Sequence, residues 1–171
     1  MRQLEKLFEL SDSVAETADR CVRVAVVLLL AVISIFMITR VLLRYVLLMS
    51  IIWIAEATGF LLAYVAFWGA SICLRADRHI KVDFLVRKMS ERGQLIMSIL
   101  AMGLVVYLSI FLITGGWDYA TRVAGRLTLS GVFQETHARL SVATGGVFLL
   151  IQSANNLLQQ LRKLILTFLP A

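Results

Sequence analysis

Few residues in this 171-residue sequence have the types and spacing that catalysis or metal binding needs. It has two histidines, His79 and His137, and two cysteines, Cys21 and Cys73, and the members of each pair lie far apart in sequence. A catalytic zinc site needs about three clustered ligands, and a haem needs axial ligands inside its helices. The G-x-S-x-G, P-loop and H-E-x-x-H motifs are also missing. The sequence therefore predicts no catalytic residues, no metal site and no cofactor, and we expect the chain not to be an enzyme.

Glu56 is the acidic residue closest to the interior of an apolar stretch. An ionisable residue within a membrane span is a candidate functional site, here a proton carrier. However, Glu56 lies at the start of an expected helix, where a carboxylate is stabilised by the positive helix end. Trp53, three residues earlier, is typical of a membrane interface. The pattern favours an interfacial cap or a salt bridge to a partner over a buried proton carrier.

The composition places these residues in a membrane protein. The chain is 60% hydrophobic and 16% charged, with a mean hydropathy of +0.85, whereas a soluble domain carries about 25% charged residues. A small soluble domain cannot hide that much apolar surface from water. Ten glycines, one proline and two cysteines exclude disorder, collagen and a disulfide scaffold. The remaining class is an integral membrane protein.

Four uncharged apolar runs, 16 to 25 residues long, interrupt the charged segments. A helix needs about 20 residues to cross a hydrocarbon core of ~30 Å. The first run lacks the flanks of a cleaved signal peptide, so we expect it to be retained. The sequence thus predicts an all-α fold in a single membrane domain over residues 1–171, with four transmembrane helices at about 21–43, 54–74, 93–117 and 140–161.

Basic residues are distributed unequally between the two sides that four spans would create. Residues 1–23, 75–92 and 162–171 carry twelve Lys and Arg, whereas residues 40–56 and 118–139 carry five. Because basic residues near span ends favour the cytoplasm, we expect both termini to be cytoplasmic. The net charge of +6 reflects this bias. We expect no nucleic-acid partner, since no basic patch is interleaved with stacking aromatic residues.

The segment before the first run has the pattern of an amphipathic helix, which we place at residues 1–20. Its apolar residues fall on one helical face, and five acids spaced 4, 3, 4 and 3 form a stripe on another. One interpretation is an interfacial helix that leads into the first span. The other is that the stripe docks on a partner protein. The stripe consists of Glu5, Glu9, Asp12, Glu16 and Asp19.

Small residues recur along the second run at spacings of 4, 3 and 4, which gives one smooth helical face. Such faces allow close approach of two helix backbones in a membrane. Ordinary packing inside one bundle explains the pattern, and contact with a separate membrane subunit is the alternative. The face comprises Gly59, Ala63, Ala66 and Ala70.

The fourth run ends in carboxamides that share one helical face. Facing lipid tails would be costly for these groups, so the face should meet protein or water. Emergence of the helix into the cytoplasm is one explanation, and contact with a partner is the other. The face comprises Gln152, Asn155, Asn156 and Gln159. The candidate subunit contacts are Asn155 and Gln159 from this face, the small-residue face of the second run, and Glu56.

Several large residues near the run ends have the chemistry of membrane-interface anchors. Tryptophan is enriched at the headgroup level, and arginine can extend its charged end to the headgroups. The predicted anchors are Trp53, Trp68, Trp117, Arg40 and Arg44.

The stretch from Arg44 to Asp83 carries short motifs whose order and spacing are more specific than any one of them. They are Arg44-Tyr45-Val46, Trp53, Glu56, Tyr64, Phe67-Trp68-Gly69-Ala70, Leu74-Arg75 and His79-Ile80-Lys81-Val82-Asp83. In a chain of this size with four apolar runs, this stretch resembles the small membrane subunit of the tripartite ATP-independent periplasmic (TRAP) transporters. Arg75, His79 and Asp83 are thereby family-motif residues.

The resemblance implies a function in transport across the bacterial inner membrane. Such subunits are partners of a large multi-span permease that holds the substrate and sodium sites, and an extracytoplasmic binding protein delivers an organic acid anion to the pair. The resemblance therefore implies a scaffold surrounded by membrane lipids that binds neither sodium nor substrate itself. The alternative is an autonomous proton-coupled transporter or channel that uses Glu56.

Overall fold

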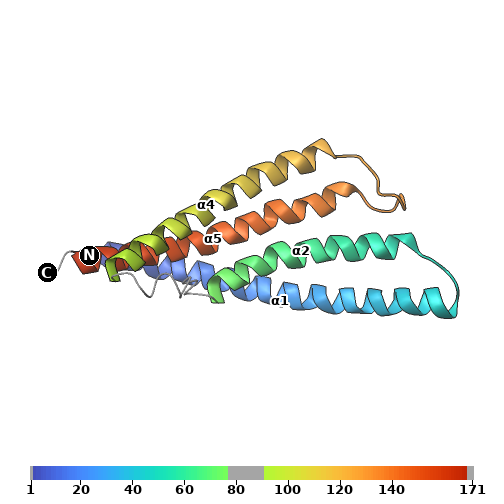
Figure 1. Ribbon diagram of the computed structural model, residues 1–171, viewed down its shortest axis with the longest axis horizontal. Coiled ribbons are helices and arrows are strands. Elements are labelled where there is room, and N and C mark those ends of the chain that lie inside the picture. Colours follow the sequence, from blue (N-terminus) through green and yellow to red (C-terminus); the bar gives the residue numbers. More distant parts are fainter. Residues whose placement is uncertain (1, 77–90, 169–171) are drawn as a thin grey trace.

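The computed structural model describes the backbone of residues 2–76 and 91–168, and the side chains of residues 11–75, 93–94 and 96–162. His79 and Asp83 lie outside the described residues. Outside one isolated β-bridge between Leu127 and Gln134, all regular structure in the described part is helical, which confirms the all-α prediction. Four helices are described: α1 (Arg2–Val46), α2 (Ile52–Ala76), α4 (Glu91–Arg122) and α5 (Glu135–Phe168) (Figure 1).

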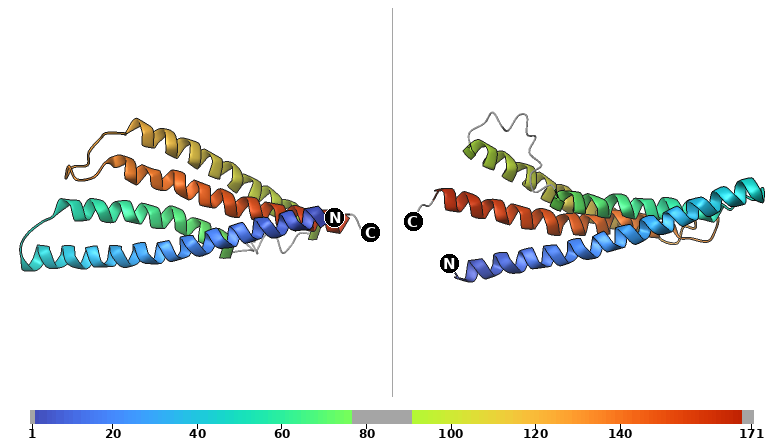
Figure 2. Two further views of the ribbon diagram at one scale, coloured as in Figure 1. Left: turned by 180° about the vertical axis from the view of Figure 1, so that it is seen from behind. Right: turned by 90° about the horizontal axis from the view of Figure 1, so that it is seen from below.

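The helices form an open layer rather than a closed bundle. Each contacts its neighbour in the order α4, α5, α2, α1, and the N-terminal part of α1 also touches α5. In the described part of the chain, no Cα atom of α4 lies within 8 Å of one in α1 or α2. The two chain ends lie at the same end of the layer (Figures 1 and 2). The main core cluster of buried residues is accordingly small, with Leu74, Met102 and Leu149 at its centre.

Three of the helices are long and apolar enough to cross a membrane: Ser11–Val46, Ile52–Arg75 and Ile96–Arg122. Only 6% to 17% of the most apolar window of each is buried, so the chain itself covers little of this apolar surface completely. In water this would be an aggregating surface, whereas in a bilayer it faces lipid or a partner. Helix α5 does not qualify by composition, because the carboxamides of its second half lower its hydropathy.

The amphipathic segment and the first span are one continuous helix of 45 residues. The sequence places the amphipathic helix at residues 1–20 and the first span at about 21–43, and the structure joins the two without a break. No glycine or proline interrupts α1, and its inward-facing residues keep the same 4-3-4 spacing across the expected boundary. These residues are Ala15, Asp19, Val22 and Val26, all buried. Because the inner face does not change direction, nothing ends the helix there.

Glycine lets α5 approach both of its neighbours closely in the middle of the layer. A Cβ atom on Gly145 would lie 2.4 Å from the Cβ of Phe67 in α2. One on Gly146 would lie 2.9 Å from the Cγ1 of Ile113 in α4, and one on Gly116 of α4 would lie 2.8 Å from the backbone nitrogen of Ala143. Close contact between membrane helices depends on such small residues. The α2–α5 and α4–α5 seams are therefore the tightest parts of the fold.

The two turns at the end of the layer away from the termini differ in construction. After α1, Leu48 adopts a left-handed conformation with φ of +53°, and the Met49 N–H donates to the Leu43 carbonyl at 3.0 Å. After α4, the turn is closed by backbone bonds, among them Thr128 N–H to the Phe133 carbonyl at 2.9 Å. Gly131 takes the positive φ, +70°, that this turn requires. The α4–α5 turn thus holds Ser130 in place.

Candidate functional site

The end of the layer that holds the termini contains a buried cluster of polar side chains around Arg75 of α2, called here the Arg75 cluster. The Arg75 side chain is 12% exposed. Its Nη1 donates to Gln152 Oε1 of α5 at 3.3 Å. Its Nη2 lies 3.7 Å from Asp12 Oδ1, and its Nε lies 3.9 Å from Asp19 Oδ2, both on α1. One guanidinium therefore connects three helices.

The polar face of α5 completes this cluster. Asn155 Nδ2 and Gln159 Nε2 donate to Asp12 Oδ1 at 3.1 and 3.2 Å. Gln152 Nε2 donates to the Ala15 carbonyl at 2.7 Å. Further bonds run from Ser11 Oγ to Asn155 Oδ1 and from Asn156 Nδ2 to the Leu74 carbonyl. The carboxamide face thus meets protein, and the protein that it meets is α1 and α2 of the same chain.

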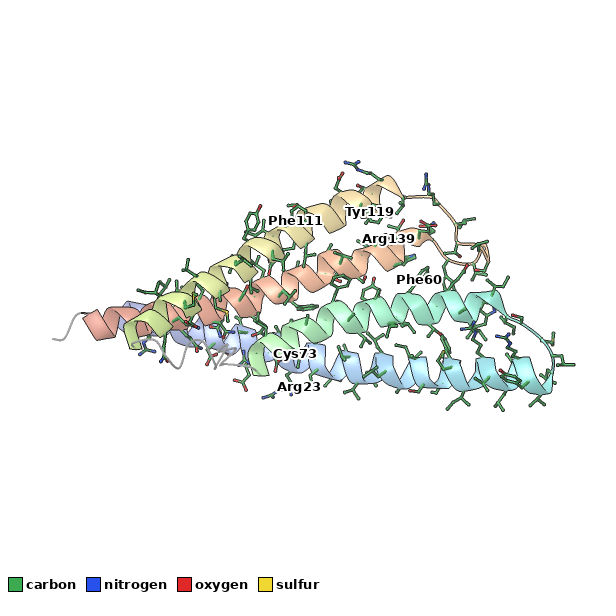
Figure 3. All side chains as sticks on the ribbon, viewed as in Figure 1. Arg23, Phe60, Cys73, Phe111, Tyr119 and Arg139 are labelled. Atoms are coloured by element: carbon green, nitrogen blue, oxygen red, sulfur yellow. The ribbon has the colours of Figure 1, made fainter. Side chains whose placement is uncertain are left out.

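The charges of the Arg75 cluster are balanced. Asp19 Oδ2 accepts a 2.8 Å hydrogen bond from Arg23, so two carboxylates face two guanidinium groups. A buried charge is tolerated only when it is paired and hydrogen-bonded. Asp19 Oδ1 is the buried carboxylate oxygen that finds no partner among the described residues. Figure 3 labels Arg23 on α1 and Cys73 on α2 at this place.

Sequence patterns alone missed this cluster. The acidic stripe was expected on a surface, but its members Asp12 and Asp19 turn inward, whereas Glu16 stays exposed and pairs with Arg20 at 3.3 Å. A signal was present, because both the two aspartates and the pair Gln152 and Gln159 are seven residues apart, which is two helical turns. Matching them with Arg75 requires knowing which helices are neighbours.

The small-residue face of α2 is left uncovered. Gly59, Ala66 and Ala70 are exposed, and Ala63 is half-buried. A Cβ atom on Gly59 would have no atom within 4 Å. Packing against another helix of this chain is therefore not what this face does in the described structure. The glycines that do pack closely are those of the α5 seams.

Glu56 joins the other end of α2 to the α4–α5 turn. Its Oε1 accepts a 3.0 Å hydrogen bond from the Ser130 backbone N–H, and its Oε2 accepts one from the Ser130 hydroxyl. Thr128 Oγ1 lies 3.1 Å from Ser130 Oγ, so the turn is tied together around the carboxylate. This places Glu56 as an anchor of a turn within the chain.

The predicted anchors occupy different environments. Trp68 packs between α2 and α5, where its Nε1 donates to Thr144 Oγ1 at 3.1 Å and its ring meets Phe148 edge-on at 5.6 Å. Trp68 is thus a residue of the α2–α5 seam, and its role as a membrane-interface anchor stays a prediction. Trp53 packs edge-on against Phe36 at 6.1 Å. The exposed predicted anchors are Trp53, Trp117, Arg40 and Arg44.

The two polar sites are separated by about the thickness of a membrane. Arg75 follows Glu56 by 19 residues of one helix, which corresponds to about 29 Å. The hydrocarbon core of a bilayer is ~30 Å thick. The intervening part of α2 is apolar or small, and its main polar contacts are local or run to α5. The geometry holds helices together at two levels of the layer, about 29 Å apart along α2.

The apolar middle of the layer has few described groups that could bind a charged ligand. Among the described residues, no group of three or more His, Cys, Asp or Glu side chains could hold a metal ion. The charged groups that α2 contributes lie at its two ends and are engaged by Ser130 or by the Arg75 cluster. What this arrangement does chemically is to join helices.

Comparison with known proteins agrees with the motifs. The family of tripartite ATP-independent periplasmic transporters, DctQ component, matches residues 33–163. The C4-dicarboxylate TRAP transporter small permease protein DctQ of Vibrio cholerae is 31% identical over 80 residues, which are 47% of this chain and 34% of that protein. A Haemophilus influenzae protein named as a TRAP transporter small permease protein is 27% identical over 105 residues, 61% of this chain and 65% of that protein.

The chain thus covers less than two thirds of the length of each of these relatives. The family match, in contrast, covers most of the chain and includes the Arg75 and Glu56 sites. The matched proteins are transporter components, which confirms that the chain is a membrane protein of a transport system and not an enzyme. A tripartite system also implies two further components. The chain belongs to the DctQ component family of the tripartite ATP-independent periplasmic transporters, as a small permease subunit.

Proposed function

We propose that this small permease subunit forms a scaffold with a large permease subunit in the bacterial inner membrane. The pair takes up an organic acid anion delivered by an extracytoplasmic binding protein, with coupling to sodium. The observation that carries the proposal is the open layer of outward-facing apolar helices whose buried charges only join helices. A transport site is instead typically built from broken helices and polar groups near the midplane.

In this proposal all four helices cross the membrane, and both termini lie in the cytoplasm. Helix α5 can serve as the fourth span because its carboxamides are bonded to α1 and α2 rather than facing lipid. The excess of basic residues on the side of the termini supports the orientation. The N-terminal part of α1 then extends beyond the bilayer on the cytoplasmic side of the Arg75 cluster.

The small-residue face of α2 is the proposed contact with the large subunit. A membrane helix can approach Gly59 and Ala66 closely because no side chain among the described residues covers them. Trp53 and Trp117 are exposed and suit the membrane interface, so they would resist tilting of the scaffold. Asn155 and Gln159 would support this contact indirectly, because they hold α1 against α5. Glu56 would support it by holding the α4–α5 turn against α2.

Reconstituted uptake tests the proposal. Proteoliposomes containing this chain, a large TRAP permease and its binding protein should accumulate a labelled organic acid when a sodium gradient is imposed. C4-dicarboxylates are the first substrates to test, because one relative carries that name. Omission of any component should abolish uptake. Transport by this chain alone, lost in Glu56→Gln, would instead support an autonomous transporter.

A pair of matched variants tests the contact face. Ala66 and Ala31 are both exposed alanines, on α2 and α1. Ala66→Leu should prevent co-purification with the large subunit because leucine blocks close backbone approach. Ala31→Leu should leave co-purification unchanged. If both variants co-purified equally well with the large subunit, the subunit contact would lie elsewhere.

A further inference from the structure

The end of α1 and the α1–α2 turn enclose a small hollow with an unusual lining. Its walls comprise Arg40, Leu43, Arg44, Met49, Ser50 and Ile51. Its polar side chains are two guanidinium groups and one hydroxyl, and it has no carboxylate. We propose that this hollow binds the phosphodiester group of an anionic phospholipid.

Both arginines follow from the register of α1. Val22 and Val26 are buried and Phe36 is half-buried on the face that α1 turns toward α2, and Arg40 continues this face four residues after Phe36. Phe36 already meets Trp53, the second residue of α2, so α2 does not continue past this level. The inner face of α1 therefore ends in guanidinium groups that α2 leaves uncovered.

No acidic side chain neutralises these two charges. In the part of the chain that the structure describes, neither Arg40 nor Arg44 forms an ion pair. The first turn of α2 contains no acid, and Glu56 is bonded to Ser130. The Ser50 hydroxyl, which also lines the hollow, adds a further donor. Guanidinium groups bind phosphate oxygens through two parallel hydrogen bonds, so the hollow has the chemistry of a phosphate site.

The surroundings select a lipid as the source of the phosphate. Exposed apolar residues lie on both sides of the arginines: Ile38 and Val41 before Arg44, and Tyr45, Leu47 and Leu48 after it. Leu48 is 88% exposed. An inorganic phosphate would use only the donors, whereas the acyl chains of a phospholipid also cover the apolar residues on the membrane side of Arg44, such as Ile38 and Val41. A net negative headgroup suits the two uncompensated positive charges better than a zwitterionic one.

Native mass spectrometry of the purified full chain in a neutral detergent tests the inference, with phosphatidylglycerol and phosphatidylcholine as probes. The double variant Arg40→Gln/Arg44→Gln is compared with Arg122→Gln/Arg126→Gln, which removes two arginines from the α4–α5 end. Wild type and the control should retain one phosphatidylglycerol per chain. The Arg40/Arg44 variant should bind it at least about tenfold more weakly, the loss of one charged hydrogen bond.

Further arms distinguish other ligands and keep the result interpretable. Millimolar inorganic phosphate should not displace the lipid; equal competition by free phosphate would overturn the lipid assignment. Unchanged phosphatidylglycerol binding in the Arg40/Arg44 variant would also overturn it, as would equal binding of phosphatidylcholine. If the large subunit displaces the lipid and the variant loses assembly, a partner carboxylate occupies the hollow instead. Arg44→Lys, which keeps the charge but not the planar fork, should bind with intermediate affinity and checks that loss is not caused by misfolding.

Discussion

Each end of α2 is joined to other parts of the chain through one charged side chain, but the surroundings of the two charges differ. At one end, Arg75 is buried among two carboxylates and a carboxamide and joins three helices. At the other end, Glu56 accepts two hydrogen bonds from one serine of a turn. A buried charge cluster is sensitive to the loss of any member, whereas a half-exposed helical acid that is bonded to a turn retains access to water. The Arg75 cluster should therefore determine the fold far more strongly than the Glu56 contact.

Arg75→Met should have the largest effect. It removes the cation that Asp12 and Asp19 share, and loss of one partner of a buried pair costs about 3–5 kcal/mol. Because Arg23 still pairs with Asp19, the expected loss lies at the lower end of this range. Thermal unfolding of the full chain in detergent measures this. Arg122→Met removes an arginine from an exposed pair with Asp118 and should change the melting temperature little. Similar losses in both variants would show that the Arg75 cluster is not buried in solution.

Gly145→Ala tests the seam between the two ends. The new Cβ would lie 2.4 Å from the Cβ of Phe67, so α2 and α5 must separate, and overpacking of this kind costs about 1–3 kcal/mol. Gly59→Ala is the matched control because its Cβ has free space. The unfolding temperature should fall only in the first variant. A fall in both would mean that the small-residue face of α2 is packed within the chain.

Glu56→Gln should have a clearly smaller effect than Arg75→Met. The amide oxygen can still accept from the Ser130 N–H, but the amide nitrogen can only donate to the Ser130 hydroxyl oxygen, so two charge-assisted hydrogen bonds become two weaker neutral ones. Loosening should be confined to the α4–α5 turn and is measured by hydrogen exchange at Ser130 and neighbouring amides. Asp118→Asn, at the same end of the molecule, should leave that exchange unchanged. If Glu56→Gln instead unfolded the whole chain, the Glu56 contact would determine the fold at least as strongly as the Arg75 cluster.

Leu48→Gly should have the smallest effect and the opposite sign. A left-handed conformation costs a branched residue about 1–2 kcal/mol, and Leu48 has little packing to lose at 88% exposure. Glycine adopts this conformation without the steric cost but loses more backbone entropy on folding. The free energy of unfolding should therefore rise by about 0.5 kcal/mol. The measurement is thermal unfolding in detergent, with Leu47→Gly, which lies outside the left-handed region, as control. A loss of stability would show that the Leu48 side chain makes contacts within the chain.

Sequence was sufficient for the properties that depend on local composition. Hydropathy predicted a membrane protein, an all-α fold and the apolar helices, because the cost of exposing polar backbone to lipid leaves few other structures. The motifs between Arg44 and Asp83 were sufficient to predict the family. The sequence placed Glu56 at a helix start, but its bonds to Ser130 of the α4–α5 turn were not predicted.

Tertiary structure decided what depends on how the helices face one another. The inward turn of Asp12 and Asp19, the place of Trp68 in a seam and the continuity of α1 were not predicted from the sequence. The same periodic pattern is compatible with an exposed stripe or a buried one until the neighbouring helices and their rotation are known. Gly145 and Gly59 illustrate the reason: the residue type is the same, but only the arrangement of α5 beside α2 makes one a tight contact and leaves the other open.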